Sequence, residues 1–151
     1  MEMPMDKKHY RSLLIMTLLS FVSMYVLMYA MVNSPANVFS SFNQFYMAGL
    51  MTAPMVMLEV LLMKGMYGNK RWNALILGIT AVAGIAFFGF IRQQTAITDT
   101  QFLRSMIPHH GGAILMCEKA PLQDVKIKEL CRNIIVNQRT EIEQMKALLA
   151  K

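Results

Sequence analysis

The sequence has little charge, few cysteines and a single tryptophan. Asp, Glu, Lys and Arg make up 16% of its 151 residues, against 55% hydrophobic residues, and there are two cysteines. So low a charge content argues against one ordinary soluble domain, and two cysteines are too few for a disulfide framework. The net charge of +6 does not indicate nucleic-acid binding, because seven of the fifteen Lys and Arg flank apolar segments.

Three long apolar segments occupy the first two thirds of the chain, at about residues 12–32, 44–63 and 72–91. Each is long enough, at about 1.5 Å per residue, to cross roughly 30 Å of hydrocarbon as a helix. A signal peptide is the competing interpretation of the first, but its apolar core is usually shorter and ends at a small-x-small site. We therefore predict an all-α membrane protein with a membrane domain at residues 1–91.

Basic residues flank these segments unevenly. Three Lys or Arg precede the first segment, none lies between the first and second, and three lie in the loop around Lys64 to Arg71. Because cytoplasmic loops carry the excess of Lys and Arg, the N-terminus is predicted to be cytoplasmic. Three crossings then place residues 92–151 outside the cytoplasm, in the periplasm of a bacterium with an outer membrane.

Residues 102–117 concentrate side chains that bind metals, including two of the three histidines. Helical spacing places Met106, one of the two histidines, and Met116 or Cys117 on one face. Thioethers favour Cu(I), and imidazole accepts copper or zinc. Pro108 and the Gly111-Gly112 pair weaken a helix here, as is expected where function outweighs stability. The alternative is ordinary core packing, in which methionine is a common filler.

The C-terminal third predicts two helices that fold back on each other. Thr98 and Gln101 have capping-box spacing, Pro121 ends the first helix, and Asp124 can cap the second. Each helix carries an apolar stripe, and Gln138 lies within the second stripe. Because two helices cannot bury both stripes, we expect a second subunit to complete a four-helix bundle.

This stretch resembles a known bacterial family. The run FLRSMIPHHGGAILM, followed by IIVNQRTEIEQM, is similar to the family called domain of unknown function 305, which shares M-x-x-H-H and Q-x-x-E-I-x-x-M on paired helices. The resemblance covers roughly residues 99–149 and implies a ferritin-like, extracytoplasmic, copper-handling hairpin. This chain has the hairpin once, whereas many members have it twice, and it has cysteines at 117 and 131 where a small residue is usual. The matching positions are Met106, His109, His110, Gln138, Glu141, Ile142 and Met145.

The predicted ligands bind copper, as Cu(I), with zinc as the alternative. The principal candidates are Met106, His109, His110 and Met116. The auxiliary candidates are Cys117, Gln138, Glu141 and Met145. Ferritin-like oxidase chemistry needs Glu-x-x-His pairs, and residues 106 and 107 are methionine and isoleucine. The sequence therefore does not predict an enzyme.

Cys117 and Cys131 admit three roles: metal ligand, disulfide or small core residue. They lie at unequal distances from the turn, which sets them about 6 Å out of level by helical rise. A disulfide usually needs Cα atoms 4.4–6.8 Å apart. This geometry disfavours a disulfide, so we expect core residues first and a ligand second, with all three roles left open.

A second methionine-rich pattern lies in the middle apolar segment, at every fourth position. Packing is the simpler interpretation, but a carboxylate within a membrane span often marks an ion path or an internal partner. The members are Met47, Met51, Met55, Glu59 and Met63.

The function predicted from the sequence is copper sequestration, delivery or tolerance by a membrane-anchored protein of the bacterial inner membrane. Its expected partners are the lipid bilayer, further copies of itself as a dimer or larger, and other copper-handling proteins. One alternative is a copper-conducting protein that uses the stripe around Glu59. Another is a structural or assembly subunit without metal.

Overall fold

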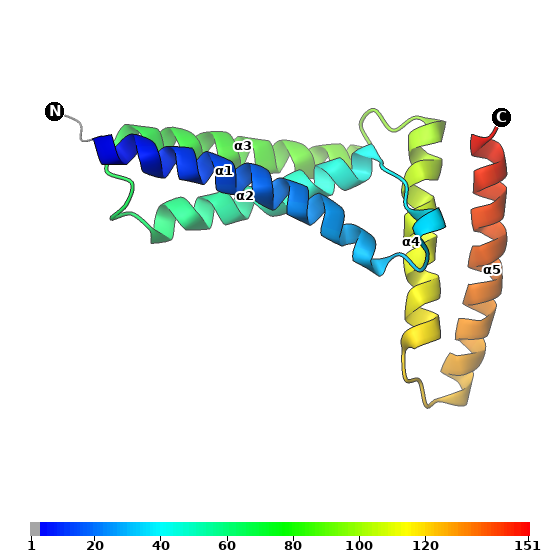
Figure 1. Cartoon of the computed structure of the whole chain (residues 1–151). Coiled ribbons are helices and arrows are strands. Elements are labelled where there is room, and N and C mark those ends of the chain that lie inside the picture. Colours follow the sequence, from blue (N-terminus) through cyan, green and yellow to red (C-terminus); the bar gives the residue numbers. More distant parts are fainter. Residues whose placement is uncertain (1–3) are drawn as a thin grey trace. The chain divides into compact units, whose positions relative to one another are not determined.

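The computed structural model describes residues 4–151, and in that range it is all helical, without strands (Figure 1). The described residues form two compact units. The apolar unit comprises residues 4–27 and 43–95, and the hairpin unit comprises residues 28–42 and 96–151. In chain order the helices are α1 Pro4–Leu27, the 3-10 helices η1 Met28–Met31 and η2 Pro35–Asn37, α2 Phe42–Leu62, α3 Lys70–Gln93, α4 Asp99–Lys119 and α5 Val125–Leu149.

Three helical stretches are long and apolar enough to cross a membrane. They are Lys7–Met31, Phe42–Leu62 and Lys70–Gln93, with mean hydropathies of 2.1, 1.7 and 2.4. These bounds agree with the predicted spans to within a few residues, and the all-α prediction is confirmed for the described chain. The first helical stretch begins earlier than predicted because basic residues form its first turns and favour a helix as well as leucine does.

In the apolar unit, small residues allow the helices to pack closely, and threonine hydroxyls form hydrogen bonds within their own helices. A Cβ on Gly49 would collide with the ring of Phe87, and one on Gly84 would lie 3.3 Å from the Cβ of Ala53. Such positions let helix backbones approach closely. The hydroxyls of Thr17, Thr52 and Thr80 each donate to the carbonyl four residues earlier. Ile76 and Leu77 of α3 pack against a small buried cluster that joins α1, α2 and the loop after α2: Leu13, Val56, Val60 and Tyr67.

The hairpin unit pairs α4 with α5, which run side by side in opposite directions (Figure 1). Its core is Ile107 and Ile114 of α4 against Ile142 and Met145 of α5. Thr98 accepts from the Gln101 N–H as predicted. The Gln101 side chain does not complete the capping box, because its Oε1 accepts from the N–H of Phe42 at 2.9 Å.

The connecting segment at residues 28–42 belongs to the hairpin unit and packs on α4. A Cβ on Gly111 would lie 2.7 Å from Asn33 Oδ1 and 3.2 Å from Val32 Cγ1, and one on Gly112 would lie 3.4 Å from the Met31 carbonyl. The glycine pair is therefore explained by close packing of the connecting segment. The metal site is not needed to account for it.

Cys117 and Cys131 form a disulfide, with Cα atoms 5.2 Å apart. The prediction of two core cysteines is wrong, and so is Cys117 as a free thiolate ligand. The prediction assumed that α4 ends level with the start of α5. Ala120 and Asp124 are extended, so the chain runs past the end of α4 before α5 begins (Figure 1). That offset brings the two cysteines level.

Candidate metal centre

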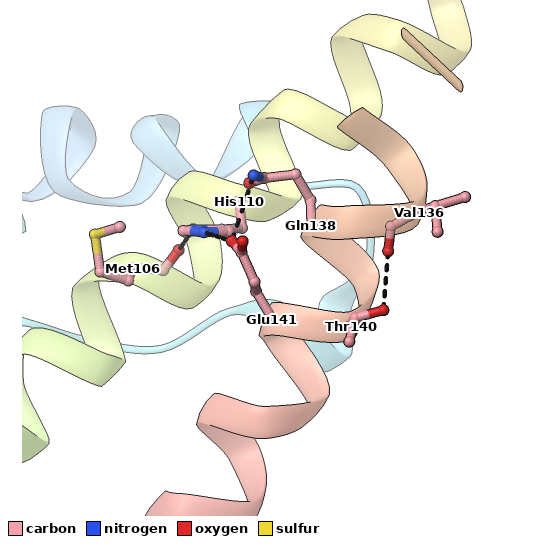
Figure 2. Close-up of polar contacts among 6 residues, drawn as sticks. All are labelled: Met106, His110, Val136, Gln138, Thr140 and Glu141. Atoms are coloured by element: carbon pink, nitrogen blue, oxygen red, sulfur yellow. Dashed lines mark hydrogen bonds and ion pairs between the residues drawn. The ribbon is translucent and has the colours of Figure 1, made fainter. Parts of the chain in front are cut away.

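His110 is the centre of the polar contacts in the hairpin. His110 is buried, with 8% of its surface exposed. Its Nδ1 lies 2.8 Å from the Met106 carbonyl oxygen, and its Nε2 lies 2.6 Å from Glu141 Oε2 on α5 (Figure 2). Because a carbonyl oxygen can only accept, Nδ1 carries a hydrogen. Nε2 faces the carboxylate, and a hydrogen bond between the two requires one shared proton.

Glu141 bridges the histidine to the remainder of the candidate site on α5. The Gln138 Nε2 lies 3.5 Å from the same Oε2, and Figure 2 shows Gln138 and Glu141 both reaching toward His110. The Glu141 side chain is 49% exposed, against 10% for the His110 side chain. The pair thus has a buried imidazole side and an accessible carboxylate side, through which an ion from solvent could reach Nε2.

The other predicted ligands lie farther from the His110–Glu141 pair. His109 is exposed, and its ring centroid is 6.0 Å from that of His110. Met106 contributes its carbonyl, while its thioether points away from the pair (Figure 2) and its side chain packs against the hairpin core. Met116 is 54% exposed.

The donor set fits a metal ion only in part. A metal-binding histidine usually donates one ring N–H to a carbonyl or carboxylate, which orients the other nitrogen toward the metal. His110 has this arrangement, and a metal at Nε2 would take the place of the shared proton. Within residues 4–151, however, no three His, Cys, Asp or Glu side chains are grouped closely enough to hold a metal together. Further donors would come from His109, a thioether or another chain.

Comparison with known proteins identifies the family to which this chain belongs. Residues 51–149, about two thirds of the chain, match the family described as a domain of unknown function, DUF305. The chain belongs to the DUF305 family. It is also 36% identical over 140 residues to an uncharacterized protein, L153, of Acanthamoeba polyphaga mimivirus, covering 91% of this chain and 90% of that protein. No solved structure matches. The DUF305 match includes α3 and much of α2, more than the stretch on which the resemblance rested.

Sequence reasoning undervalued Glu141 in this DUF305 chain, because it ranked the residue as auxiliary. The signal was present. Glu141 follows Gln138 by three residues and so lies on the same side of α5, beside the stripe that faces α4. Two polar residues together next to a core-facing stripe indicate a polar partner across the interface. His110 is that partner.

The methionine stripe of α2 does not form an enclosed path within the described chain. Met47, Met51 and Met63 are 39%, 40% and 39% exposed. Glu59 Oε1 accepts a hydrogen bond from the hydroxyl of Tyr67 at 3.2 Å. Tyr67 is 4% exposed, and its burial, with the negative charge of Glu59 adding to the effect, raises the pKa of its phenol. The carboxylate thus has an internal partner, which was one of the two predicted alternatives.

Proposed function

We propose that this DUF305 protein is a membrane-anchored copper-binding protein that sequesters or delivers copper outside the cytoplasm, without catalysis. The observation that carries the proposal is His110, whose Nδ1–H is fixed by the Met106 carbonyl and whose Nε2 faces Glu141 across the hairpin. The copper is held by Nε2, with His109 and thioethers brought by a second copy as further donors. Imidazole with thioether favours Cu(I), while Glu141 extends the range to Cu(II) or zinc.

The grouping of the chain into units supports the membrane topology. The connecting segment at residues 28–42 and the C-terminal residues 96–151 share one compact unit, so they lie on one side of the bilayer. That requirement is met when all three apolar helices cross. With the basic residues inside, the hairpin unit is extracytoplasmic. A periplasmic reporter fused after Lys151 is expected to be active and one inserted at Gly68 inactive, and the reverse pattern would contradict this orientation.

An unburied face of the hairpin supports assembly with a second copy. One row on α4 advances in steps of four and three residues, which is the spacing of a helix–helix seam. In an antiparallel pair, the flank of α4 that carries His109 and the flank of α5 that carries Glu141 lie on the same side. The α4 row is Phe102, Met106, His109, Ala113 and Met116, and the apolar residues of the α5 flank are Ile127, Leu130, Ile134 and Leu148.

A second hairpin on this face would complete a four-helix bundle. It would also bring a second His109 and a second Glu141 close to the first pair. This supplies the donors that one chain lacks, since the described residues of one chain hold no group of three. Copper then lies between two subunits, shielded from water, and is released when the subunits separate or exchange it with a partner.

Metal analysis of protein purified in detergent from copper-supplied cells tests the proposal. We expect copper in the parent and in the control His9→Ala, and its loss in the double variant His109→Ala/His110→Ala with helix content unchanged. If the parent protein contains zinc instead of copper, the proposed site stands and the ion that it binds is zinc. Equal copper in the parent and the double variant would overturn the proposal.

A further inference from the structure

The apolar unit has a groove that is lined by all three of its helices. Its volume is about 380 Å³. Its walls are residues 10–21 of α1 and 76–87 of α3, which run in the same direction (Figure 1), and its floor includes Ala53 of α2. Leu14 and Ile79 on the walls are exposed, whereas Ala53 is buried. The groove therefore opens between α1 and α3.

The lining of this groove presents few hydrogen-bonding groups to an occupant. Apart from Tyr10 and three threonines, the lining residues are hydrocarbon or glycine. The hydroxyls of Thr17, Thr52 and Thr80 each donate to a carbonyl of their own helix. Because these donors are already satisfied, the groove suits a hydrocarbon chain better than a polar ligand or an ion.

The length of the groove matches one leaflet of a bilayer. From residue 10 to residue 21, and from residue 76 to residue 87, each helix advances by about 16 Å. Bilayer hydrocarbon is roughly 30 Å thick, and one leaflet contributes half of it. The groove ends at Phe21 and Phe87, whose ring centroids lie 5.0 Å and 6.2 Å from that of Phe45. An acyl chain that enters from the N-terminal ends of α1 and α3 would reach these rings near the bilayer midplane.

The N-terminal end of the groove is basic on the α1 side. Lys7 lies one helical turn before Tyr10, and Arg11 lies one turn before Leu14. Tyr10 and Leu14 both line the groove. Lys7 and Arg11 are exposed, and neither is in an ion pair within residues 4–151. Two cationic side chains therefore stand at the entrance to an apolar groove.

The start of α3 brings two more cationic side chains to the same end. The Tyr10 hydroxyl donates to the Asn69 carbonyl, with the oxygens 3.2 Å apart, and this contact places the start of α3 beside α1. Lys70 and Arg71 follow Asn69 directly and are exposed. Basic pockets between membrane helices on the cytoplasmic side bind anionic lipid headgroups.

A second groove of the apolar unit, between α2 and α3, lacks such an end. Its volume is about 460 Å³, and Met57 and Ala81 are among its lining residues. The sequence has one basic residue within a helical turn of that lining, Arg92. An apolar groove and a cluster of basic residues therefore coincide at the first groove and not at the second.

We propose that the groove between α1 and α3 binds one anionic phospholipid of the cytoplasmic leaflet. Its phosphate lies at Lys7, Arg11, Lys70 and Arg71, and one acyl chain runs along the groove toward Phe21 and Phe87. This rests on the membrane position proposed above, and not on copper binding by the hairpin. A zwitterionic phospholipid has the same chains, but its cationic group is repelled by the basic residues. Charge therefore selects the lipid, and the groove fixes its place.

The experiment uses full-length protein in detergent, titrated with phosphatidylglycerol or with phosphatidylcholine of identical acyl chains. Bound lipids are counted by native mass spectrometry. Lys7→Gln/Arg11→Gln is compared with Lys126→Gln/Lys128→Gln, which removes the same charge from the hairpin unit. Ala83→Leu narrows the groove, and Ala81→Leu is its matched control because Ala81 lines the second groove. Circular dichroism checks that each variant keeps its helix content.

We expect one phosphatidylglycerol per chain, bound about tenfold or more tightly than phosphatidylcholine. Lys7→Gln/Arg11→Gln should remove most of this preference, and Ala83→Leu should weaken phosphatidylglycerol binding, while both controls leave it unchanged. Equal binding of the two lipids, or equal effects of the charge variant and its control, would overturn the proposal.

Equal phosphatidylglycerol binding by Ala83→Leu and Ala81→Leu would also overturn it, because the lipid would then be held by the basic surface alone. The charge variant alters only exposed side chains, so it still tests the proposal if Ala83→Leu does not fold. Copper content is measured in the same samples. Lipid binding without copper, or copper without lipid binding, therefore distinguishes failure of one proposal from failure of the other.

Discussion

The two units of this protein expose apolar side chains for different reasons. In the apolar unit they surround all three helices: Val82 and Ile85, for example, are 68% and 72% exposed, and the polar groups turn inward to Tyr67, Asn73 and the backbone. In the hairpin unit, Leu130 and Met116 are 57% and 54% exposed beside His109 and Glu141. The first pattern suits lipid, and the second suits another protein surface.

The two units also differ in what holds them together. The apolar unit relies on close approach at Gly49 and Gly84, and its helices are apolar enough to cross a membrane. The hairpin unit has four buried apolar side chains in its core, the disulfide, and an ion pair between Arg139 and Glu118 at 2.7 Å. The ion pair is exposed and contributes little. The hairpin unit therefore has a covalent link between its two helices, which the described residues of the apolar unit lack.

The largest expected effect is on assembly. A glutamate at Leu130 would place a charge in the proposed seam between two copies, where burial without a partner is costly. Leu130→Glu is therefore expected to convert a dimer to monomers in detergent-corrected light scattering. Val136→Glu is the matched control, because Val136 is 64% exposed on the other flank of α5. A monomeric parent, or equal effects of both substitutions, would refute the dimer.

The next largest effect is expected from removal of the disulfide, which should destabilise the hairpin unit and leave the unfolding of the apolar unit unchanged. The cysteines are 14 residues apart in sequence, and closing a loop of that length stabilises by about 3 kcal/mol. Cys117→Ser/Cys131→Ser is expected to lower the melting of the hairpin unit by circular dichroism. The unfolding reported by Trp72 fluorescence, which belongs to the apolar unit, should be unchanged. A shift of both signals together would mean that the units do not unfold separately.

A smaller effect is expected from the glycines. Gly111→Ala adds a methyl group 2.7 Å from Asn33 Oδ1, whereas Gly78→Ala meets nothing within 4 Å. We expect the first to destabilise the hairpin unit by about 1–2 kcal/mol through overpacking. The second should stabilise its helix by up to about 1 kcal/mol. Chemical denaturation of both variants checks this, and stabilisation by Gly111→Ala would show that the connecting segment does not pack on α4.

The smallest expected effect concerns pH. Burial raises the pKa of Tyr67 above its ordinary value of 10.0, so the folded chain holds this proton more tightly than the unfolded chain. The contribution to stability is complete below pH 10 and is lost as the pH rises through the raised pKa. Tyr67→Phe should flatten this alkaline loss in denaturation curves of the apolar unit, and Tyr25→Phe should not. Identical dependence of stability on pH in the Tyr67→Phe and Tyr25→Phe variants would show that the burial of Tyr67 does not cause the alkaline loss.

Much of the architecture could be predicted because it depends on local pattern. The spans follow from runs of apolar residues, and the caps at Thr98 and Asp124 from residue type. The disulfide could not be predicted, because it depends on how far the extended loop carries the chain beyond α4. The role of Gly111 depends on Val32 and Asn33, which lie nearly eighty residues earlier in the chain. His110 and Glu141 were both candidates, but their direct contact depends on the register of two helices.

The central claim is that His110 binds copper, and a competition titration with a Cu(I) chelator tests it most directly. The full-length protein is compared with His110→Ala and with His9→Ala, the only other histidine outside the hairpin pair. We predict that His110→Ala weakens Cu(I) binding by at least about 100-fold, beyond what loss of an outer contact costs, and that His9→Ala leaves it unchanged. Equal affinity of the parent and His110→Ala would contradict the account.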